Sequence, residues 1–527
     1  MLHIDVGLSA IRASQQALYA ISNNVANANT EGYHRQRVEL IDRNPITIGA
    51  LQIGTGVEVE HLSRLRDTAT EGALISTNSL HSESETYLRI LEQIEAALLP
   101  TQGSLTDSVS NFFNELEQLA AQPSTVTIRD AVLAAAYDVV KQISRLDSRM
   151  NQLRTNNAIE VAEEVDAVNQ ATAQIAELNK DIRILSHSGT APNTLLDQRD
   201  RLVSELSKSV EISLQTYLVE ESPLVAANGA VLIAEEATQL VAVTSPDGHA
   251  AVETQNGGNP VNPLSGALAG LLAGQELIDS IQASLHEWAT EFVQSIDQIH
   301  STGLGHNQAN NELQGSRAIT DVPSPLSEIE TPYDLNSGSL FVTLTHLGTG
   351  ERTTQEIIVD TATDSLDDVI SQLDSLPNLS ASFQPDAKKL LLRATSGYAI
   401  DFAGGIDAVP QSSTLTGTAS PRLSGFPSVT GNANWTATVV GSGTVGVTSG
   451  LQIELTDTIS GDVIRSVSVG DNYLPGEKIE LGNGINLTLS IGTLNAGESF
   501  QFDLVNNADE TGLLVALGIN TLFSGDV

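Results

Sequence analysis

Residues 128–188 contain neither glycine nor proline, and this absence constrains the fold more than any other feature of the chain. Their apolar residues alternate at spacings of four and three, the pattern of a helix that packs lengthwise on other helices. One continuous helix would extend roughly 90 Å here, at about 1.5 Å per residue. The sequence therefore predicts a rod-like helical region whose apolar stripe, named here the central seam, consists of Val132, Ala136, Val139, Ile143, Leu146, Met150, Leu153, Val161, Val165, Val168 and Ile175.

Two polar signals accompany the central seam. Thr127 and Asp130 have the spacing of a capping box, which predicts where the long helix begins. Asn157 occupies a seam position, where a polar side chain commonly sets the register of packing.

Residues 4–25 carry a second stripe of the same spacing, named here the N-terminal seam, with Gln15 and Ser22 at its remaining positions. A single helix with such a stripe needs a partner, because exposed apolar surface lowers solubility. The helix leads into the asparagine-rich stretch 23–36. From the conformational preferences of its residues alone, this stretch is interpreted as a helix C-cap and a turn. A strand is predicted at 35–41. The N-terminal seam consists of Ile4, Leu8, Ile11, Leu18 and Val25.

Further helices are predicted by apolar periodicity at residues 69–100, 105–121, 194–207 and 278–299. One more short helix is expected at 510–517. A small β region is expected over about 210–254. From about residue 319 to 504 the composition changes to alternating Thr, Ser, Gly and Val, which indicates two β-rich units. In the helix at 105–121, the expected buried side consists of Val109, Phe112, Phe113, Leu116 and Leu119.

Composition excludes several classes of protein. A formal charge of −40 disfavours binding to nucleic acid or to anionic membranes, both of which require a basic surface. The absence of cysteine excludes disulfides, thiolate metal sites and cysteine nucleophiles. No apolar run is long enough for a transmembrane helix, and the N-terminus lacks the features of a cleaved secretory signal. At 527 residues, three or four domains are expected.

No catalytic or metal-binding constellation stands out, so the prediction is a protein without enzymatic activity and without a cofactor. The pair His286-Glu287 lacks the second histidine of a zinc protease motif, and no GxSxG motif is present. The charged run Asp197, Arg199, Asp200 and Arg201 is interpreted as an exposed helix face with weak ion pairs.

The stretch 23–36 resembles the N-terminal signature of bacterial flagellar axial proteins, the rod, hook and hook-associated subunits. Two positions depart from the common pattern: Glu31 replaces proline, and His34 replaces serine or threonine; both are interpreted as exposed turn positions. The matching positions are Asn23, Asn24, Ala26, Asn27, Ala28, Asn29, Thr30, Gly32, Tyr33, Arg35 and Gln36.

Four other segments, 53–67, 103–133, 195–212 and 510–525, are similar to the hook-associated junction subunits of this family, which lie between hook and filament. The resemblance implies a multidomain α + β fold, with a coiled-coil-like helical bundle of the D0/D1 type and inserted, mainly β outer domains. The residues that carry this narrower resemblance include Phe112, Phe113, Leu195, Asp197, Arg199 and Asp200.

The resemblance also implies a domain plan, partners and a location. Expected partners are further copies of the chain, the hook protein, a second junction protein (hook-associated protein 3) and an export chaperone, with no nucleic acid and no membrane insertion. The expected location is extracellular, after export through the flagellar type III apparatus without a cleaved signal. The predicted parts are an axial helix and linker at 1–68, a helical domain at 69–318, outer β domains at 319–427 and 428–504, and a return to the helical domain at 505–527.

Family members continue past the segment that ends this chain with long helices that pair with the N-terminal helix. Because the N-terminal seam has no evident mate in the sequence, we expect the chain to be a truncation at Val527. Two alternatives remain open at this point. One is another flagellar axial protein, of the hook or rod; the other is a secreted adhesin or glycan-binding protein that uses the Thr- and Ser-rich β region.

Overall fold

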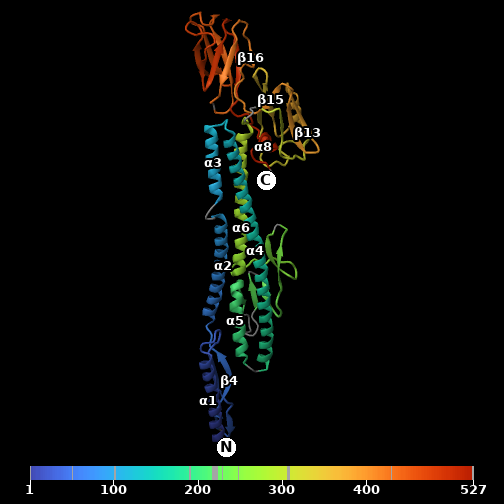
Figure 1. Ribbon diagram of the computed structural model, residues 1–527. Coiled ribbons are helices and arrows are strands. Elements are labelled where there is room, and N and C mark those ends of the chain that lie inside the picture. The colour runs from blue at the N-terminus through green and yellow to red at the C-terminus, as the bar shows by residue number, and fades with distance from the viewer. Residues whose placement is uncertain are drawn as a thin grey trace. The chain divides into compact units, whose positions relative to one another are not determined.

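The computed structural model describes residues 2–49, 51–99, 103–188, 191–215, 224–227, 230–246, 248–305, 309–428 and 430–524. The chain has a multidomain α + β fold, with long helices in its first half and mostly strands in its second (Figure 1). Its residues group into two compact units, Met1–His286 and Glu287–Val527. Each unit is described by itself.

The first unit is built on long helices. As predicted, a single helix, α4 (Val126–His187), covers the stretch without glycine or proline. Helix α3 (Leu105–Ala121) packs on the first part of α4, and α5 (Asn193–Ser209) packs on its later part. Helix α2 (Thr68–Leu98) contacts both α4 and α5, and α6 (Ala267–Ser301) begins in this unit.

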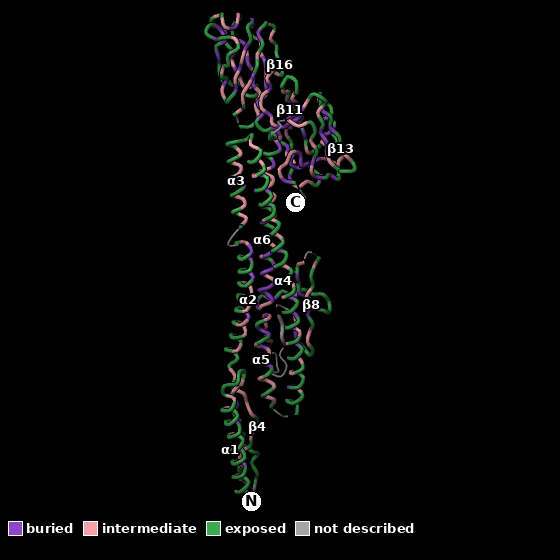
Figure 2. Tube along the Cα trace, viewed as in Figure 1, coloured by how far each residue is buried: buried purple, intermediate pink, exposed green. Residues whose placement is uncertain are grey.

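The central seam of α4 is the core of the first unit (Figure 2). Val161, Val168 and Ile175 are fully buried there, together with Ile90 and Ile94 of α2. Asn157 is also buried, and its side-chain amide donates a hydrogen bond to the backbone carbonyl of Leu271 on α6 at 3.0 Å. This bond fixes the two helices at one relative height, as a polar seam residue is expected to do.

A helix and a β-hairpin form the N-terminal part of the first unit. Helix α1 (Leu2–Ala26) is followed by β1 (Gln36–Asp42), which pairs antiparallel with β4 (Val57–Arg64). A small hairpin, β2 (Ile46–Ile48) with β3 (Leu51–Ile53), lies between them in sequence.

The predicted small β region follows α5. It contains a three-stranded sheet of β5 (Ser213–Gln215), β6 (Leu224–Ala227) and β7 (Ala230–Ile233). A hairpin of β8 (Leu240–Thr244) and β9 (Ala250–Thr254) then packs on α4.

In the described part of the second unit, two large hydrophobic cores are separate from one another. Around the first lie two sheets, ordered β12-β11-β15 and β10-β14-β13, and the short helix α7, with a second short helix described below. The elements are β10 (Glu312–Gln314), β11 (Gly338–His346), β12 (Arg352–Val359), α7 (Leu366–Asp374), β13 (Leu379–Gln384), β14 (Lys389–Ala394) and β15 (Tyr398–Asp401).

Around the second core, a five-stranded sheet has the order β16-β25-β18-β20-β21, and a three-stranded sheet has the order β17-β23-β22. A two-stranded ladder joins β19 to β24. These strands are β16 (Ser412–Ser413), β17 (Pro421–Gly425), β18 (Ala433–Val440), β19 (Gly443–Thr444), β20 (Gln452–Asp457), β21 (Val463–Ser468), β22 (Ile479–Gly482), β23 (Ile485–Leu489), β24 (Thr493–Leu494) and β25 (Ser499–Leu504).

The last helix, α8 (Leu513–Leu517), lies in the first of these two cores. It is shorter than the predicted helix at 510–517. The reason is local: Asp509 accepts hydrogen bonds from the backbone of Thr511 and Gly512, and Gly512 adopts a left-handed conformation. These two features hold the chain in a turn before α8 begins.

Two other local predictions were wrong. Helix α4 is capped at Thr125, whose side chain makes no capping hydrogen bond, so the signal at Thr127 and Asp130 is not used. In α3 the side chain of Phe112 is fully buried, whereas Phe113 is 46% exposed. The centroids of the two rings are 5.6 Å apart, in an edge-to-face arrangement. Helix α3 packs on α4, and the side of α3 that carries Phe113 stays partly exposed.

Candidate functional site

The signature stretch closes a hydrogen-bonded connection between α1 and β1. The side chain of Asn24 pairs with the backbone of Gln36 in both directions, donating to its carbonyl at 2.8 Å and accepting from its N–H at 2.9 Å. The Tyr33 hydroxyl donates to the same Asn24 oxygen at 2.8 Å. The chain reverses through Gly32, which adopts a φ of 77°, open to glycine at little cost. The stretch is a helix end followed by a turn, as expected. In addition, its hydrogen bonds hold the start of β1 against the end of α1.

The other asparagines of the signature stabilise the end of α1. The Asn27 amide donates to the backbone carbonyl of Asn23 at 3.0 Å and to its side-chain oxygen at 2.9 Å. Thr30 donates in turn to Asn27 at 3.2 Å. The Asn23 carbonyl also accepts the backbone N–H of Asn27 at 3.0 Å, so these side-chain bonds reinforce the last turn of α1.

Helix α1 buries small residues and exposes large ones. Ser9, Ala13 and Ala20 are buried on the side that contacts β1 and β4. Gly56, at the start of β4, approaches so closely that a β-carbon there would collide with Ser9. Because α1 contacts β1 and β4 through these small residues, its large apolar side chains stay exposed on the surface.

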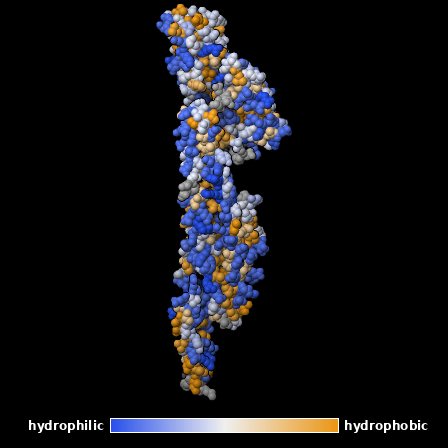
Figure 3. All heavy atoms as spheres, viewed as in Figure 1, coloured by the Kyte–Doolittle hydropathy of each residue, from blue (hydrophilic) through white to orange (hydrophobic). Residues whose placement is uncertain are grey.

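The N-terminal seam is therefore a surface. Its five residues, Ile4, Leu8, Ile11, Leu18 and Val25, range from 41% to 74% exposed. Apolar side chains are visible over this end of the first unit in Figure 3. Among the described residues, β1 and β4 are the elements that α1 chiefly contacts, and both lie on its other side.

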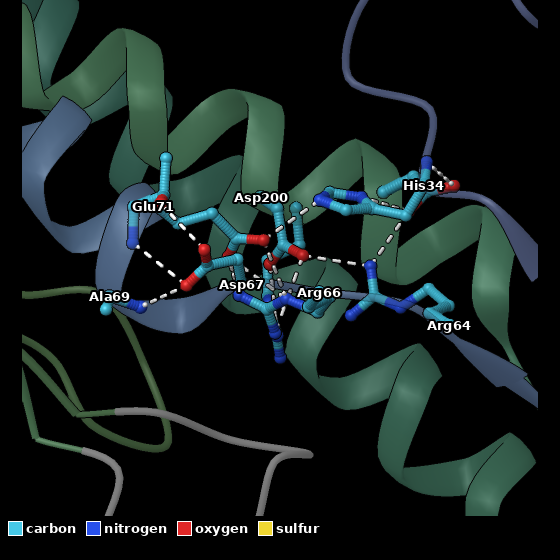
Figure 4. A network of polar contacts seen from close by, with 10 residues as sticks. His34, Arg64, Arg66, Asp67, Ala69, Glu71 and Asp200 are labelled. Atoms are coloured by element: carbon cyan, nitrogen blue, oxygen red, sulfur yellow. Dashed lines mark hydrogen bonds and ion pairs between the residues drawn. The ribbon is translucent and has the colours of Figure 1, made fainter.

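A network of ion pairs connects the N-terminal part to the helices; it is named here the joint (Figure 4). Arg64, at the end of β4, contacts Asp197 of α5 at 2.8 Å and Asp200 at 2.9 Å. The His34 ring lies between two carboxylates, with Nδ1 at 2.8 Å from Asp197 and Nε2 at 3.1 Å from Glu71 of α2. The joint consists of His34, Arg64, Arg66, Glu71, Asp197 and Asp200.

The joint corrects two expectations. Asp197, Arg199 and Asp200 do not form an exposed face: Arg64 and Arg199 are almost wholly buried, and the two carboxylates are mostly buried. His34 is not an exposed turn residue but a bridge between α2 and α5. Sequence periodicity could not show this, because the partners of α5 are 133 and more residues away in the chain.

Electrostatics at the joint follow from this burial. Burial lowers the pKa of the Arg199 guanidinium from its ordinary value, and the neighbouring Asp200 carboxylate opposes that change. The pKa of the Tyr33 hydroxyl is raised, first by burial and then by the negative charge of Asp197. A cavity of about 640 Å³ borders the joint, between the turn at Gly32 and helices α2 and α5.

Four residues of the joint were missed by the sequence reasoning as functional positions: His34, Arg64, Arg66 and Glu71. One signal was present, since the segment 53–67 that carries both arginines is among those that resemble junction subunits. Of the predicted junction residues, Asp197, Arg199 and Asp200 meet at the joint, whereas Phe112 and Phe113 lie on α3, apart from it. Leu195 lies at the start of α5 and is half-buried.

The final segment docks on the end of α6 within the second unit. Asp297, which is fully buried, accepts hydrogen bonds from the backbone N–H groups of Leu522 and Phe523 at 2.8 and 3.1 Å. The Asn520 amide donates to the carbonyls of Ser301 and Gly303 at the end of the helix. Burial raises the pKa of the Asp297 carboxyl, and the two backbone hydrogen bonds oppose the shift.

Within the described ranges, no three His, Asp or Glu side chains are grouped closely enough to hold a metal ion. None of the helices described is both long enough and apolar enough to cross a membrane. What the described geometry offers is contact surfaces and fixed connections between elements.

Comparison with known proteins gives two family matches. Residues 91–313 match the family described as the flagellar hook-associated protein FlgK helical domain. Residues 4–34, which include the N-terminal seam and most of the signature, match the flagella basal body rod protein family.

Curated relatives are named flagellar hook-associated protein 1. The protein from Salmonella typhimurium is 31% identical over 318 residues, covering 57% of this chain and 56% of the relative. That from Bacillus subtilis is 31% identical over 239 residues, 44% of this chain and 47% of the relative. That from Escherichia coli is 30% identical over 322 residues, 58% of each. The match thus spans about half the length of these relatives.

A solved structure of the flagellar hook junction protein FlgK from Burkholderia pseudomallei is similar over 85% of this chain and 88% of that one. The sequence identity is 20% and the TM-score is 0.43.

Proposed function

We propose, from the premise that this chain is a relative of flagellar hook-associated protein 1, that it is a structural subunit of the bacterial flagellum. It forms the junction zone between hook and filament and is required for filament assembly. The observation that carries the proposal is the exposed N-terminal seam, in a segment that matches flagellar rod proteins. A helix with an uncovered heptad stripe is an assembly element, because the stripe is stable in water only when another helix covers it.

The proposed assembly is a ring or tube. The N-terminal seam lines the axis in contact with other terminal helices, and the helical domain packs against neighbouring copies. The residues 319–427 and 428–504 form outer β domains. Heterologous contacts repeated around an axis close into rings or helical tubes by symmetry alone. The subunit acts mechanically, without enzymatic activity or cofactor.

The proposed partners are further copies of the chain, the hook protein, the second junction protein (hook-associated protein 3) and an export chaperone. The subunit reaches the cell exterior through the flagellar type III apparatus, without a cleaved signal. Its charge of −40 supports a surface that repels nucleic acid and anionic lipid. The joint supports mechanical coupling, since it fixes the N-terminal part to two long helices at once.

The test is a double substitution in the N-terminal seam, Leu8→Glu with Ile11→Glu, in cells that lack their own junction subunit. Both side chains are exposed, so the purified chain should keep its circular dichroism spectrum and thermal unfolding. The variant should be absent from isolated hooks, and the cells should remain without filaments and non-motile.

The matched control is Leu347→Glu with Ile358→Glu, two exposed apolar residues of the β region, at 60% and 68% exposure. This control should be incorporated and should restore motility. Normal incorporation of the seam variant would refute the role of the N-terminal seam.

A further inference from the structure

Helix α4 has a second apolar stripe, distinct from the central seam, that the chain leaves uncovered. Val126, Leu133, Tyr137 and Val140 follow one another at spacings that place them on one narrow face of the helix. They are 54%, 54%, 70% and 40% exposed, while Val132, Ala136 and Val139 on the neighbouring face are buried. Scattered exposed apolar residues are ordinary, but Leu133, Tyr137 and Val140 lie one turn apart and form a continuous stripe, with Val126 two turns before Leu133, and such a stripe marks a contact surface.

Helix α2 presents a complementary face. Leu74, Leu80, Leu88 and Leu91 are 53%, 54%, 52% and 41% exposed and fall within about a third of the helix circumference. Ile90 and Ile94, which point into the core, lie on the other side of α2. The leucines therefore form a second uncovered surface in the same unit.

The two surfaces differ in the balance of the charges beside them: acidic residues outnumber basic ones on α2, and basic residues outnumber acidic ones on α4. Exposed Glu85, Glu92 and Glu95 lie among or next to the leucines of α2, together with Arg89, which pairs with Glu160 of α4. Lys141 and Arg145 are exposed on one side of the α4 stripe, and Arg129 lies on its other side; Asp130 and Asp138 are the acidic residues nearby. In a chain with 65 acidic and only 25 basic residues, a stripe with three basic neighbours is unusual.

The two surfaces cannot cover one another within one chain. The α4 stripe lies where α3 packs, and α3 follows α2 along the first unit, so the two surfaces are at different heights (Figure 1). A second copy shifted along the helix direction could bring its α2 face to the α4 stripe of the first. Such a contact uses two different patches, so it can repeat from copy to copy, and its shift along the helix direction builds a helical tube.

We propose that the α4 stripe of one copy binds the leucine face of α2 on the next copy, as a staggered side-by-side contact. This inference rests on the proposed function, and it names the contact that joins neighbouring subunits. Leucine and tyrosine side chains supply the apolar core, and Lys141 and Arg145 with Glu92 and Glu95 set the orientation.

The chain has no cysteine, so engineered cysteines report this contact directly. The full chain carrying both Tyr137→Cys and Leu88→Cys is produced in cells that lack their own junction subunit. Isolated hooks are then treated with a short bismaleimide and analysed by immunoblot. A ladder of dimers and higher multimers is expected, because each copy contributes one cysteine to each neighbour.

Two further arrangements define the contact. Mixing the two single variants should give dimers but no ladder, and either single variant alone should stay monomeric. Leu80→Cys and Leu91→Cys, each combined with Tyr137→Cys, cover the other possible offsets along α2. The control Tyr137→Cys with Asp166→Cys, an exposed α4 position outside both surfaces, should stay monomeric.

A charge exchange tests the orientation. Lys141→Glu should reduce the yield of the ladder, and Glu92→Lys in the same chain should restore it. No recovery on adding Glu92→Lys would contradict the proposed orientation of the two helices.

The possible failures are distinct. If the chain is present in hooks but none of the three pairs forms a ladder, this contact is wrong and the proposed function stands. If mass spectrometry of the product finds another protein joined to Tyr137→Cys, the occupant is not a second copy. If the unsubstituted chain is absent from hooks, the proposed function fails, and this contact fails with it.

Discussion

The central seam of α4 and the N-terminal seam of α1 have the same spacing of apolar residues but opposite environments. Val139, Val161, Val168 and Ile175 of the central seam are fully buried. Every residue of the N-terminal seam is at least 41% exposed. The difference lies in the neighbours: α4 is covered by α2, α3, α5, α6 and the β8–β9 hairpin, whereas α1 chiefly contacts two strands through its small residues.

This difference shows what a heptad pattern specifies. It specifies that a helix needs a partner along its length, but it does not specify whether the partner belongs to the same chain. In α4 the requirement is met during folding, and the seam contributes to stability. In α1 the seam is exposed, and under the proposed function it is left for assembly, so the seam should contribute to incorporation and hardly to folding.

The largest expected effect comes from making the same substitution in the two seams. Ile175→Ala should destabilise the first unit by about 2–5 kcal/mol, because it leaves a cavity in a fully buried position. Ile11→Ala, at a position 58% exposed, should change stability by less than about 0.5 kcal/mol. Urea unfolding, monitored by circular dichroism, measures the change in the free energy of unfolding for both variants. Equal effects would show that α1 is covered in the isolated protein.

The joint lies between the two seams, and its loss should have an intermediate effect. Asp197→Asn removes the charge that Arg64 and His34 share, and leaves a buried arginine with one fewer partner. We expect a loss of about 1–3 kcal/mol. The control Glu205→Gln, in an exposed pair with Lys208, should cost less than about 0.5 kcal/mol.

Amide hydrogen exchange shows which part of the first unit is destabilised by Asp197→Asn. The N-terminal part, α1 with β1 and β4, should exchange faster than in the unsubstituted chain. Exchange in the middle of α4 should stay slow. Uniform acceleration over both regions would mean that the joint supports the whole unit and is not a local connection.

The smallest expected effect concerns polar residues that accompany the seams, and it depends on pH. Burial opposes ionisation of Asp147, but hydrogen bonds from Gln282 at 2.6 Å and His286 at 2.9 Å lower the pKa of its carboxyl below 3.8. Because the folded pKa is depressed, this stabilisation is present above the ordinary pKa and is lost as pH falls through the folded value.

Asp147→Asn should therefore cost up to about 1 kcal/mol at neutral pH, where the carboxylate is ionised. The difference from the unsubstituted chain should shrink as the pH falls below 3.8. Gln15→Ala, at a polar position of the N-terminal seam, should have no effect at any pH. Urea unfolding at several pH values tests both. A difference for Asp147→Asn that grows in acid would contradict the sign of the pKa shift.

Local periodicity predicted much of the fold. The long helix at 126–187, the helix at 105–121 and the strands of both β units follow from patterns within short windows. Two predictions failed on local signals, the start of α8 and the cap of α4, and others failed where the outcome depended on a neighbour distant in sequence. Phe113 was expected to be buried but is 46% exposed, and Asp197 was expected to be exposed, but Arg64 and His34 cover it.

The candidate site was predictable only in part. The asparagines of the signature could be identified by resemblance, and their local bonds agree with turn chemistry. The pairing of Asn24 with the Gln36 backbone, and the joint, could not be identified. Both depend on the angle at which the strands return past α1, which no local pattern encodes.

The sequence by itself determined that this chain has two helices that need partners, because a heptad stripe of apolar residues is unstable in water wherever it occurs. It also determined the acidic surface and the absence of thiol chemistry, since composition alone fixes both. Only the tertiary structure decided which stripe is covered. Burial depends on which elements pack against one another, and the packed elements come from parts of the chain that are far apart in sequence.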